Sequence, residues 1–216
     1  MTAAKQRKCW CLTSLRLDLS LQAAMNKGRF EAFSDGVIAV IITIIVLEMR
    51  VPHGESFEAL APVFPVFLSY VLSFVYVGIY WNNHHHMLHA TSAVTGAMLW
   101  ANLHLLFWLS LIPFTTGWMG ENHFAPAPVA LYGVVLLFAA IAFRILQQLI
   151  INSQGQDSVL KKAIGSDWKG KLSLIVYAIA IPMAFASRWV SLGLYLFIAL
   201  IWLVPNRRIE KALSRK

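Results

Sequence analysis

Long apolar runs alternate with short polar connections along this chain, and the pattern predicts helices that cross a bilayer. A membrane-spanning helix needs about 20 mostly apolar residues, because each residue rises ~1.5 Å and the hydrocarbon layer is ~30 Å thick. The candidate spans are residues 30–49, 63–80, 95–115 and 127–149, and two more within the run 172–204, which is interrupted at 186–189. We therefore predict an all-α integral membrane protein with six transmembrane helices per subunit.

Composition agrees with this fold class. Hydrophobic residues make up 58% of the chain and charged residues only 13%, whereas a soluble domain averages about 25% charged residues. The surplus apolar surface predicts contact with the lipid bilayer. The net charge of +8 lies in short flanks between apolar runs, so we interpret it as an orientation signal and expect no nucleic-acid partner.

The basic residues are distributed asymmetrically among the connections. They gather before the first predicted helix, around the connection between the fourth and fifth, and after the sixth, whereas only Arg50 and Arg188 fall on the other side. Because cytosolic loops are enriched in lysine and arginine, both termini are predicted to be cytosolic. An even number of spans agrees with this topology.

The ends of the chain divide off from a central transmembrane domain at 25–206. Residues 207–216 form a basic tail that we expect to be cytosolic. Residues 1–24 contain no apolar run of signal-peptide length. Either Met25 is the true start of translation, so that 1–24 are not made, or 1–24 form a short cytosolic tail.

The first predicted helix carries polar residues that are costly in hydrocarbon. At ~100° per residue, Gly36, Val40, Thr43 and Leu47 fall on one narrow face, which we call the stripe. The stripe is either a helix-packing seam, in which Thr43 bonds a carbonyl one turn earlier, or the lining of a pore on a symmetry axis. In the second case Val40 and Leu47 form hydrophobic rings around a Thr43 ring, and the pore requires an oligomer.

Asp35, on a different face of this helix, needs a partner because an unpaired carboxylate in the membrane is unfavourable. The predicted topology places candidate partners at the same depth on the second and third helices. The residues expected to converge are Ser34, Asp35, His84 or His85, Asn102 and His104. Such a network fastens the first helix to the next two.

The histidines also suggest two other roles. His85 and His89 have metal-ligand spacing, with Glu31 and Asp35 as further donors. Adjacent histidines of a helix point in different directions, however, and no cysteine joins them, so we expect no bound metal and no cofactor. Protonation near neutral pH is the stronger alternative.

The opening of the first helix identifies a family. The pattern Arg29-x-x-x-Phe33-Ser34-Asp35, continued by Gly-Val-Ile-Ala-Val-Ile-Ile-Thr, resembles the bacterial members of the transmembrane protein 175 family of potassium channels. The resemblance extends from Met25 to the C-terminus.

Several expectations follow from the resemblance alone. Bacterial members are homotetramers of six-span subunits whose pore is lined by the first helix. Their narrow region is formed by a bulky apolar residue and a threonine at positions that here are Val40 and Thr43. Val40 is smaller than the leucine or isoleucine expected, which predicts a wider ring. The residues Arg29, Phe33, Ser34 and Asp35 are expected to pack the first helix onto the second and third.

These arguments together predict a potassium-preferring cation leak channel without enzymatic activity, in the plasma (inner) membrane of a bacterium, with itself, potassium ions and lipid as partners. The alternative is a proton-conducting channel or a proton-coupled transporter that uses Asp35 and the histidines. Transporters usually contain internal repeats and broken helices, and the sequence has no clear example of either. A membrane enzyme would need a paired nucleophile and base or a water-facing metal site, for which only the histidines are available.

Overall fold

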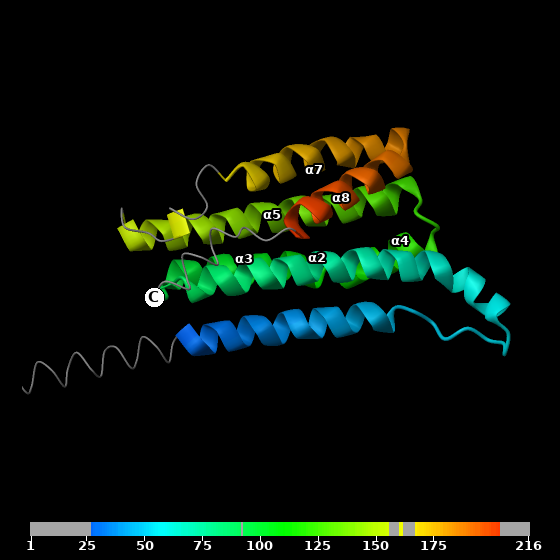
Figure 1. The fold of residues 1–216 in the computed structure, drawn as a ribbon, viewed down its shortest axis with the longest axis horizontal. Helices are drawn as coiled ribbons and strands as arrows, with labels where there is room; N and C mark the ends of the chain where they lie inside the picture. Colours follow the sequence, from blue (N-terminus) through cyan, green and yellow to red (C-terminus); the bar gives the residue numbers. More distant parts are fainter. Residues whose placement is uncertain (1–26, 92, 156–159, 162–166, 204–216) are drawn as a thin grey trace, which may run out of the picture.

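A computed structural model describes residues 27–91, 93–155, 160–161 and 167–203 (Figure 1). The predicted tails at 1–24 and 207–216 lie outside this part of the chain. All regular structure within the described residues is helical, which confirms the predicted fold class. The helices are Lys27–Leu47 (the 27–47 helix), η1 (Phe57–Val63), α2 (Phe64–His89), α3 (Gly96–Ser110), α4 (Ile112–Glu121), α5 (Pro126–Gln154), α7 (Trp168–Ala186) and α8 (Arg188–Leu203).

Five stretches are long and apolar enough to cross a membrane: the 27–47 helix, η1 with α2, α3 with α4, α5, and α7. The sixth helix, α8, is apolar but has 16 residues. It is separated from α7 by Ser187 alone, within the predicted interruption. A single residue suffices for the reversal because Ser187 is extended and its N–H bonds the carbonyl of Met183 at 2.7 Å.

Helix α2 is longer than predicted, since it continues past Tyr80 to His89. The apolar run of the sequence stops at this point, just before a polar run of asparagines and histidines. The helix continues because Met87 and Leu88 are buried and His84 is 1% exposed, so this polar run still has a face that packs against the protein. This extension places all four histidines of the run on a helix.

The third predicted span is two helices rather than one. Helix α3 begins after Thr95, whose side chain accepts a hydrogen bond from the backbone N–H of Met98 at 3.3 Å, as expected for a helix cap. It ends at Ser110, and α4 starts at Ile112 with Pro113 in its first turn. Proline lacks an N–H and its ring clashes with the carbonyl four residues earlier, which explains the break.

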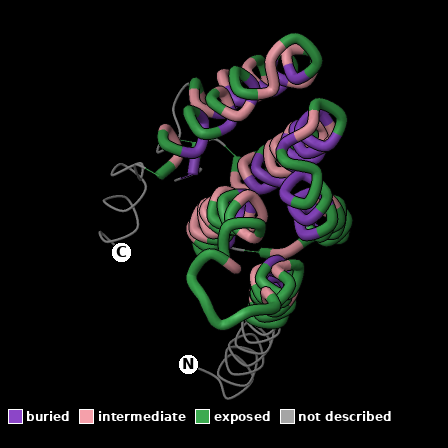
Figure 2. Tube along the Cα trace, turned by 90° about the vertical axis from the view of Figure 1, so that its right-hand side faces the viewer, coloured by how far each residue is buried: buried purple, intermediate pink, exposed green. Residues whose placement is uncertain are grey.

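Helix α5 lies at the centre of the subunit, packed against α3, α4, α7 and α8 (Figures 1 and 2). The 27–47 helix lies on the outside of the bundle, along α2. Much of the outer surface is apolar, including Phe67, Phe74 and Leu196. A soluble domain would not tolerate so much apolar surface.

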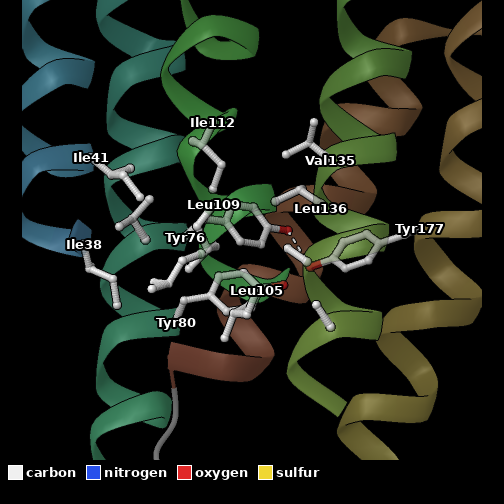
Figure 3. Packing of buried hydrophobic residues seen from close by; sticks show 14 of the residues in the cluster. Ile38, Ile41, Tyr76, Tyr80, Leu105, Leu109, Ile112, Val135, Leu136 and Tyr177 are labelled. Atoms are coloured by element: carbon white, nitrogen blue, oxygen red, sulfur yellow. Dashed lines mark hydrogen bonds between the residues drawn. The ribbon is translucent and has the colours of Figure 1, made fainter. Parts of the chain in front are cut away.

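Buried hydroxyl groups connect the helices in the interior. The Tyr177 hydroxyl donates to the Tyr76 hydroxyl at 3.2 Å (Figure 3). The Tyr76 hydroxyl donates in turn to the carbonyl of Tyr195 at 2.6 Å. Ser73 bonds both Thr116, at 2.6 Å, and Tyr132, at 3.1 Å. Each of these hydroxyls has a partner on another helix, so α2, α4, α5, α7 and α8 are connected by hydrogen bonds within the apolar core.

The two ends of the bundle differ in charge. Six of the eight described lysines and arginines lie at the end where the 27–47 helix begins, and only Arg50 and Arg188 lie at the other. The end of the bundle that carries Arg50 and Arg188 also carries four glutamates, which are Glu48, Glu55, Glu58 and Glu121. The basic residues therefore lie at the end of the bundle that the sequence predicts to be cytosolic. The cytosolic location of both termini remains a prediction.

Helices α2 and α4 approach closely at Gly120, where an added Cβ would lie 2.7 Å from the Cα of Val66. Because that contact is with backbone, we expect Gly120→Ala to destabilise the fold by about 1–3 kcal/mol through overpacking. Thermal unfolding of the purified protein in detergent measures this effect. The matched control is Gly78→Ala on α2, whose added Cβ meets nothing within 4 Å; equal melting temperatures for the two variants would contradict the close approach.

Candidate functional site

The 27–47 helix has one face buried against its own subunit. Its buried residues follow helical spacing and are Phe30, Ser34, Ile38, Ile41 and Ile45. The three isoleucines are at most 3% exposed. This spacing defines a single seam that runs the length of the helix.

The stripe lies on the opposite face. Val40 is 53% exposed and Leu47 is 78% exposed, while Gly36 and Thr43 are also exposed. A Cβ added at Gly36 would meet nothing within 4 Å. Gly36 and Val40 line an open groove whose other wall includes Pro113 and Phe114 of α4. Among the described residues, therefore, the stripe is not a packing seam.

Thr43 combines features of both interpretations. Its hydroxyl donates to the carbonyl of Val40 at 2.8 Å, the bond expected for a threonine within a helix. The proton of the hydroxyl is thereby used, and the lone pairs of its oxygen remain available. Thr43 therefore presents a hydrogen-bond acceptor on an otherwise apolar stripe.

Three polar side chains meet at the buried face of the 27–47 helix. These are Ser34, His84 and Asn102, which we call the polar cluster. The Asn102 amide nitrogen donates to the Ser34 hydroxyl at 2.9 Å, and its amide oxygen lies 2.8 Å from Nε2 of His84. The Ser34 hydroxyl donates to the carbonyl of Phe30 at 2.9 Å. All three side chains are at most 1% exposed, so the cluster connects three helices inside the protein.

Asp35 has a different partner from those predicted. Its carboxylate accepts a hydrogen bond from the indole N–H of Trp81 at 3.0 Å. Trp81 was not among the residues that the sequence singled out for this role. A signal existed, because a tryptophan near a membrane interface needs an acceptor for its N–H and Trp81 lies at the depth of Asp35 in the predicted topology.

Two predicted members of the network lie elsewhere. His85 is exposed and stacks between Trp81 and His89, with ring centroids 6.0 and 6.1 Å apart. His104 is exposed and accepts a hydrogen bond from the Trp108 indole at 2.9 Å. Helical rotation explains the result, since His104 is two residues from Asn102 and points to another face.

Arg29 and Phe33 are also on the outside of the subunit. Phe33 is 54% exposed and Arg29 is exposed, so only Ser34 and Asp35 of the motif contact the second and third helices through side-chain hydrogen bonds. The end of the helix is held by Lys27, whose Nζ donates to the carbonyl of His89 at 2.9 Å. Within the described residues, no group of three or more His, Cys, Asp or Glu side chains could hold a metal ion.

Comparison with known proteins identifies relatives of this chain. The family model described as endosomal/lysosomal potassium channel TMEM175 matches residues 29–113. A protein of Chryseobacterium sp. (strain P1-3), named as a potassium channel, is 54% identical over 190 residues, which cover 88% of this chain and 99% of that protein. The chain belongs to the TMEM175 family.

A solved structure supports the same assignment. The crystal structure of a lysosomal potassium-selective channel TMEM175 homolog from Chamaesiphon minutus matches with a TM-score of 0.69 and 26% identity, over 84% of this chain and 98% of that chain. In animals, the chicken relative is named as the endosomal/lysosomal proton channel TMEM175. It is 30% identical over 137 residues, which cover 56% of this chain and 27% of that protein.

Membership of the TMEM175 family confirms the resemblance predicted from the sequence and the prediction that this protein is not an enzyme, because the family consists of ion channels. The matched region, 29–113, includes the stripe and the polar cluster. The roles of individual residues in the stripe remain predictions.

The other end of the 27–47 helix is held by charged residues. Arg50 pairs with Glu121 at 3.2 Å. The exposed Glu48 lies against α4, so close that a Cβ on Gly117 would be 2.7 Å from its carboxylate oxygen. Polar contacts therefore lie near both ends of the helix, and the isoleucine seam packs its middle.

Replacing the central member of the polar cluster tests its contribution. Asn102→Ala leaves the buried His84 Nε2 without its partner and removes the donor to the Ser34 oxygen, while Ser34 keeps its bond to the Phe30 carbonyl. We therefore expect a loss of about 1–3 kcal/mol in stability. Thermal unfolding in detergent gives the size of the loss. Asn152→Ala is the matched control, because Asn152 is exposed and bonds only Gln148 of its own helix; a similar small effect from both would show that the cluster is dispensable.

Proposed function

We propose that this protein is a potassium-preferring cation leak channel, in which four subunits surround a pore lined by the 27–47 helix. The observation that carries the proposal is the uncovered stripe of Gly36, Val40, Thr43 and Leu47. The bacterial relative named as a potassium channel and the potassium-selective homolog of solved structure support the choice of ion.

The oligomer follows from the placement of the stripe. The 27–47 helix lies at the edge of the bundle (Figure 2), so a single subunit does not surround the space in front of it. Copies related by a rotation axis place identical stripes around one channel. The proposed number of four comes from the family resemblance.

Ions in this pore pass two kinds of ring. The Val40 and Leu47 side chains form hydrophobic constrictions that resist hydration, and the Thr43 oxygens supply acceptors between them. Thr43 is suited to this position because its proton is held by the Val40 carbonyl. A dehydrating potassium ion therefore meets oxygen lone pairs and no competing donor.

The setting is the bacterial plasma membrane, with the lysine-rich end of the bundle in the cytosol. Glu48 then lies at the outer mouth, where its charge raises the local concentration of cations. The apolar exterior of the subunit faces lipid.

A second candidate function, proton conduction, is favoured by the name of the animal relatives. Against it, the Asp35 carboxylate accepts a bond from Trp81 and His84 bonds Asn102. These groups therefore hold the 27–47 helix in place, and they lie on faces other than the stripe.

Flux measurements on purified protein in liposomes, with potassium, sodium and protons followed separately, distinguish a potassium channel from a proton channel. Proton flux without potassium flux, abolished by Asp35→Asn, would replace the first proposal with the second.

The hydrophobic ring can be widened at Val40. We expect Val40→Ala to raise potassium flux severalfold and to lower the preference for potassium over sodium, because a smaller ring is hydrated more easily. Flux in liposomes at equal protein density provides the measurement. Val71→Ala is the control, since Val71 is 41% exposed on α2 and away from the stripe; unchanged flux in both variants would remove Val40 from the constriction.

The threonine ring is tested separately. Thr43→Ala removes the acceptor oxygen with little change in helix packing, because Thr43 is exposed and bonds only its own helix. The ratio of potassium to sodium flux is expected to fall towards one while the assembled protein elutes from a sizing column as before. Ser153→Ala removes an exposed hydroxyl on α5 that bonds its own helix at Ile150, and it serves as control. An unaltered ratio in Thr43→Ala argues against this role.

A further inference from the structure

A cavity lies inside the subunit, on the far side of α2 from the 27–47 helix. It has a volume of about 40 Å³ and is formed by α2, α5, α7 and α8. Its walls include Tyr80 and Asn83 from α2, Arg144 and Gln147 from α5, and Trp202 from α8. None of these residues belongs to the stripe or the polar cluster.

Two buried polar side chains border this cavity without a hydrogen-bond partner among the described residues. Tyr80 and Gln147 are each 9% exposed, and among the described residues neither the Tyr80 hydroxyl nor the Gln147 amide has a hydrogen-bond partner. All fully enclosed side-chain nitrogen and oxygen atoms of the described residues do have partners. The two unpaired groups are therefore open to the cavity, which is the space from which a partner can reach them.

Other polar atoms around the cavity can also accept hydrogen bonds. Asn83 donates through its amide nitrogen to the carbonyl of Ile79 at 2.8 Å, which leaves its amide oxygen as an acceptor. The Tyr177 hydroxyl donates to Tyr76 and can accept one more bond. At the edge of the cavity, Arg144 pairs with Asp167 at 3.4 Å.

The volume decides which ligand fits. A water molecule needs about 10–15 Å³ measured in this way, and a cavity that binds benzene has about 150 Å³. A cavity of about 40 Å³ therefore has room for roughly three waters and excludes an aromatic ligand. Each water also needs two to four polar partners, which the tyrosine, glutamine and asparagine groups supply.

We propose that this cavity is a site for bound water, in which a small cluster bridges the Tyr80 hydroxyl, the Gln147 amide and the Asn83 amide oxygen. The waters complete the hydrogen bonding between α2 and α5 where the direct tyrosine contacts of the interior end. Tyr80 precedes Trp81, the partner of Asp35, so one turn of α2 contacts both the water site and the 27–47 helix.

Radiolytic footprinting of the full chain in detergent tests the site, because radicals formed from bound water oxidise adjacent side chains. We expect oxidation of Tyr80 and none of Tyr132, which is 0% exposed and bonded to Ser73. In water labelled with oxygen-18, the label should enter the Tyr80 product only slowly after mixing. An unmodified Tyr80, or immediate incorporation of the label as from bulk solvent, would overturn the proposal.

A pair of glutamine variants supplies an independent measurement. Gln147→Met keeps the side-chain volume but removes the partners of the water, so we expect lower Tyr80 oxidation and a melting temperature reduced by roughly 2–6 °C. Gln148→Met on the exposed face of α5 is the control and should change neither. A dry cavity predicts the reverse, an unchanged or higher melting temperature for Gln147→Met, because an apolar side chain suits an apolar space.

Discussion

Hydrocarbon offers no hydrogen-bond partners, so a polar side chain in a membrane helix has to find its partner on another part of the protein. This constraint determines how the 27–47 helix is oriented. Its isoleucine seam does not select one rotation by itself, because lipid is as apolar as the protein interior and apolar contacts gain little there. The bonds from Ser34 through Asn102 to His84 do select one. They turn Ser34 inwards and therefore turn the stripe outwards.

The same constraint explains how the helix is attached along its length. Specific polar contacts occur near its two ends, through Lys27 and the polar cluster at one end and through Arg50 at the other. Between them, the helix is held by Ile38, Ile41 and Ile45. Val40 and Thr43 lie in this middle section, where the helix meets its own subunit through apolar packing alone. Polar residues of the first helix thus serve attachment at the ends and, in the proposed pore, ion contact in the middle.

The helices in the interior of the bundle are connected by hydrogen bonds, unlike the isoleucine seam, which is purely apolar. Tyrosine, serine and threonine hydroxyls connect α2 to α4, α5, α7 and α8 through direct bonds. This bonding makes the five helices a fixed support for the 27–47 helix. Near Tyr80 the direct contacts give way to a cavity.

Much of the fold was determined by the sequence alone, because the length of an apolar run and the spacing of its residues do not depend on the rest of the protein. The helices, the turn at Ser187 and the composition of the stripe follow from these local properties. The family could also be identified from the motif around Ser34 and Asp35.

Only the tertiary structure decided which polar groups form hydrogen bonds with one another. Asn102 forms hydrogen bonds with both Ser34 and His84, whereas His104 and His85 face outwards. The Asp35 carboxylate accepts its hydrogen bond from Trp81. Pairing across helices depends on the rotation of each helix, which is set by the packing of the whole bundle.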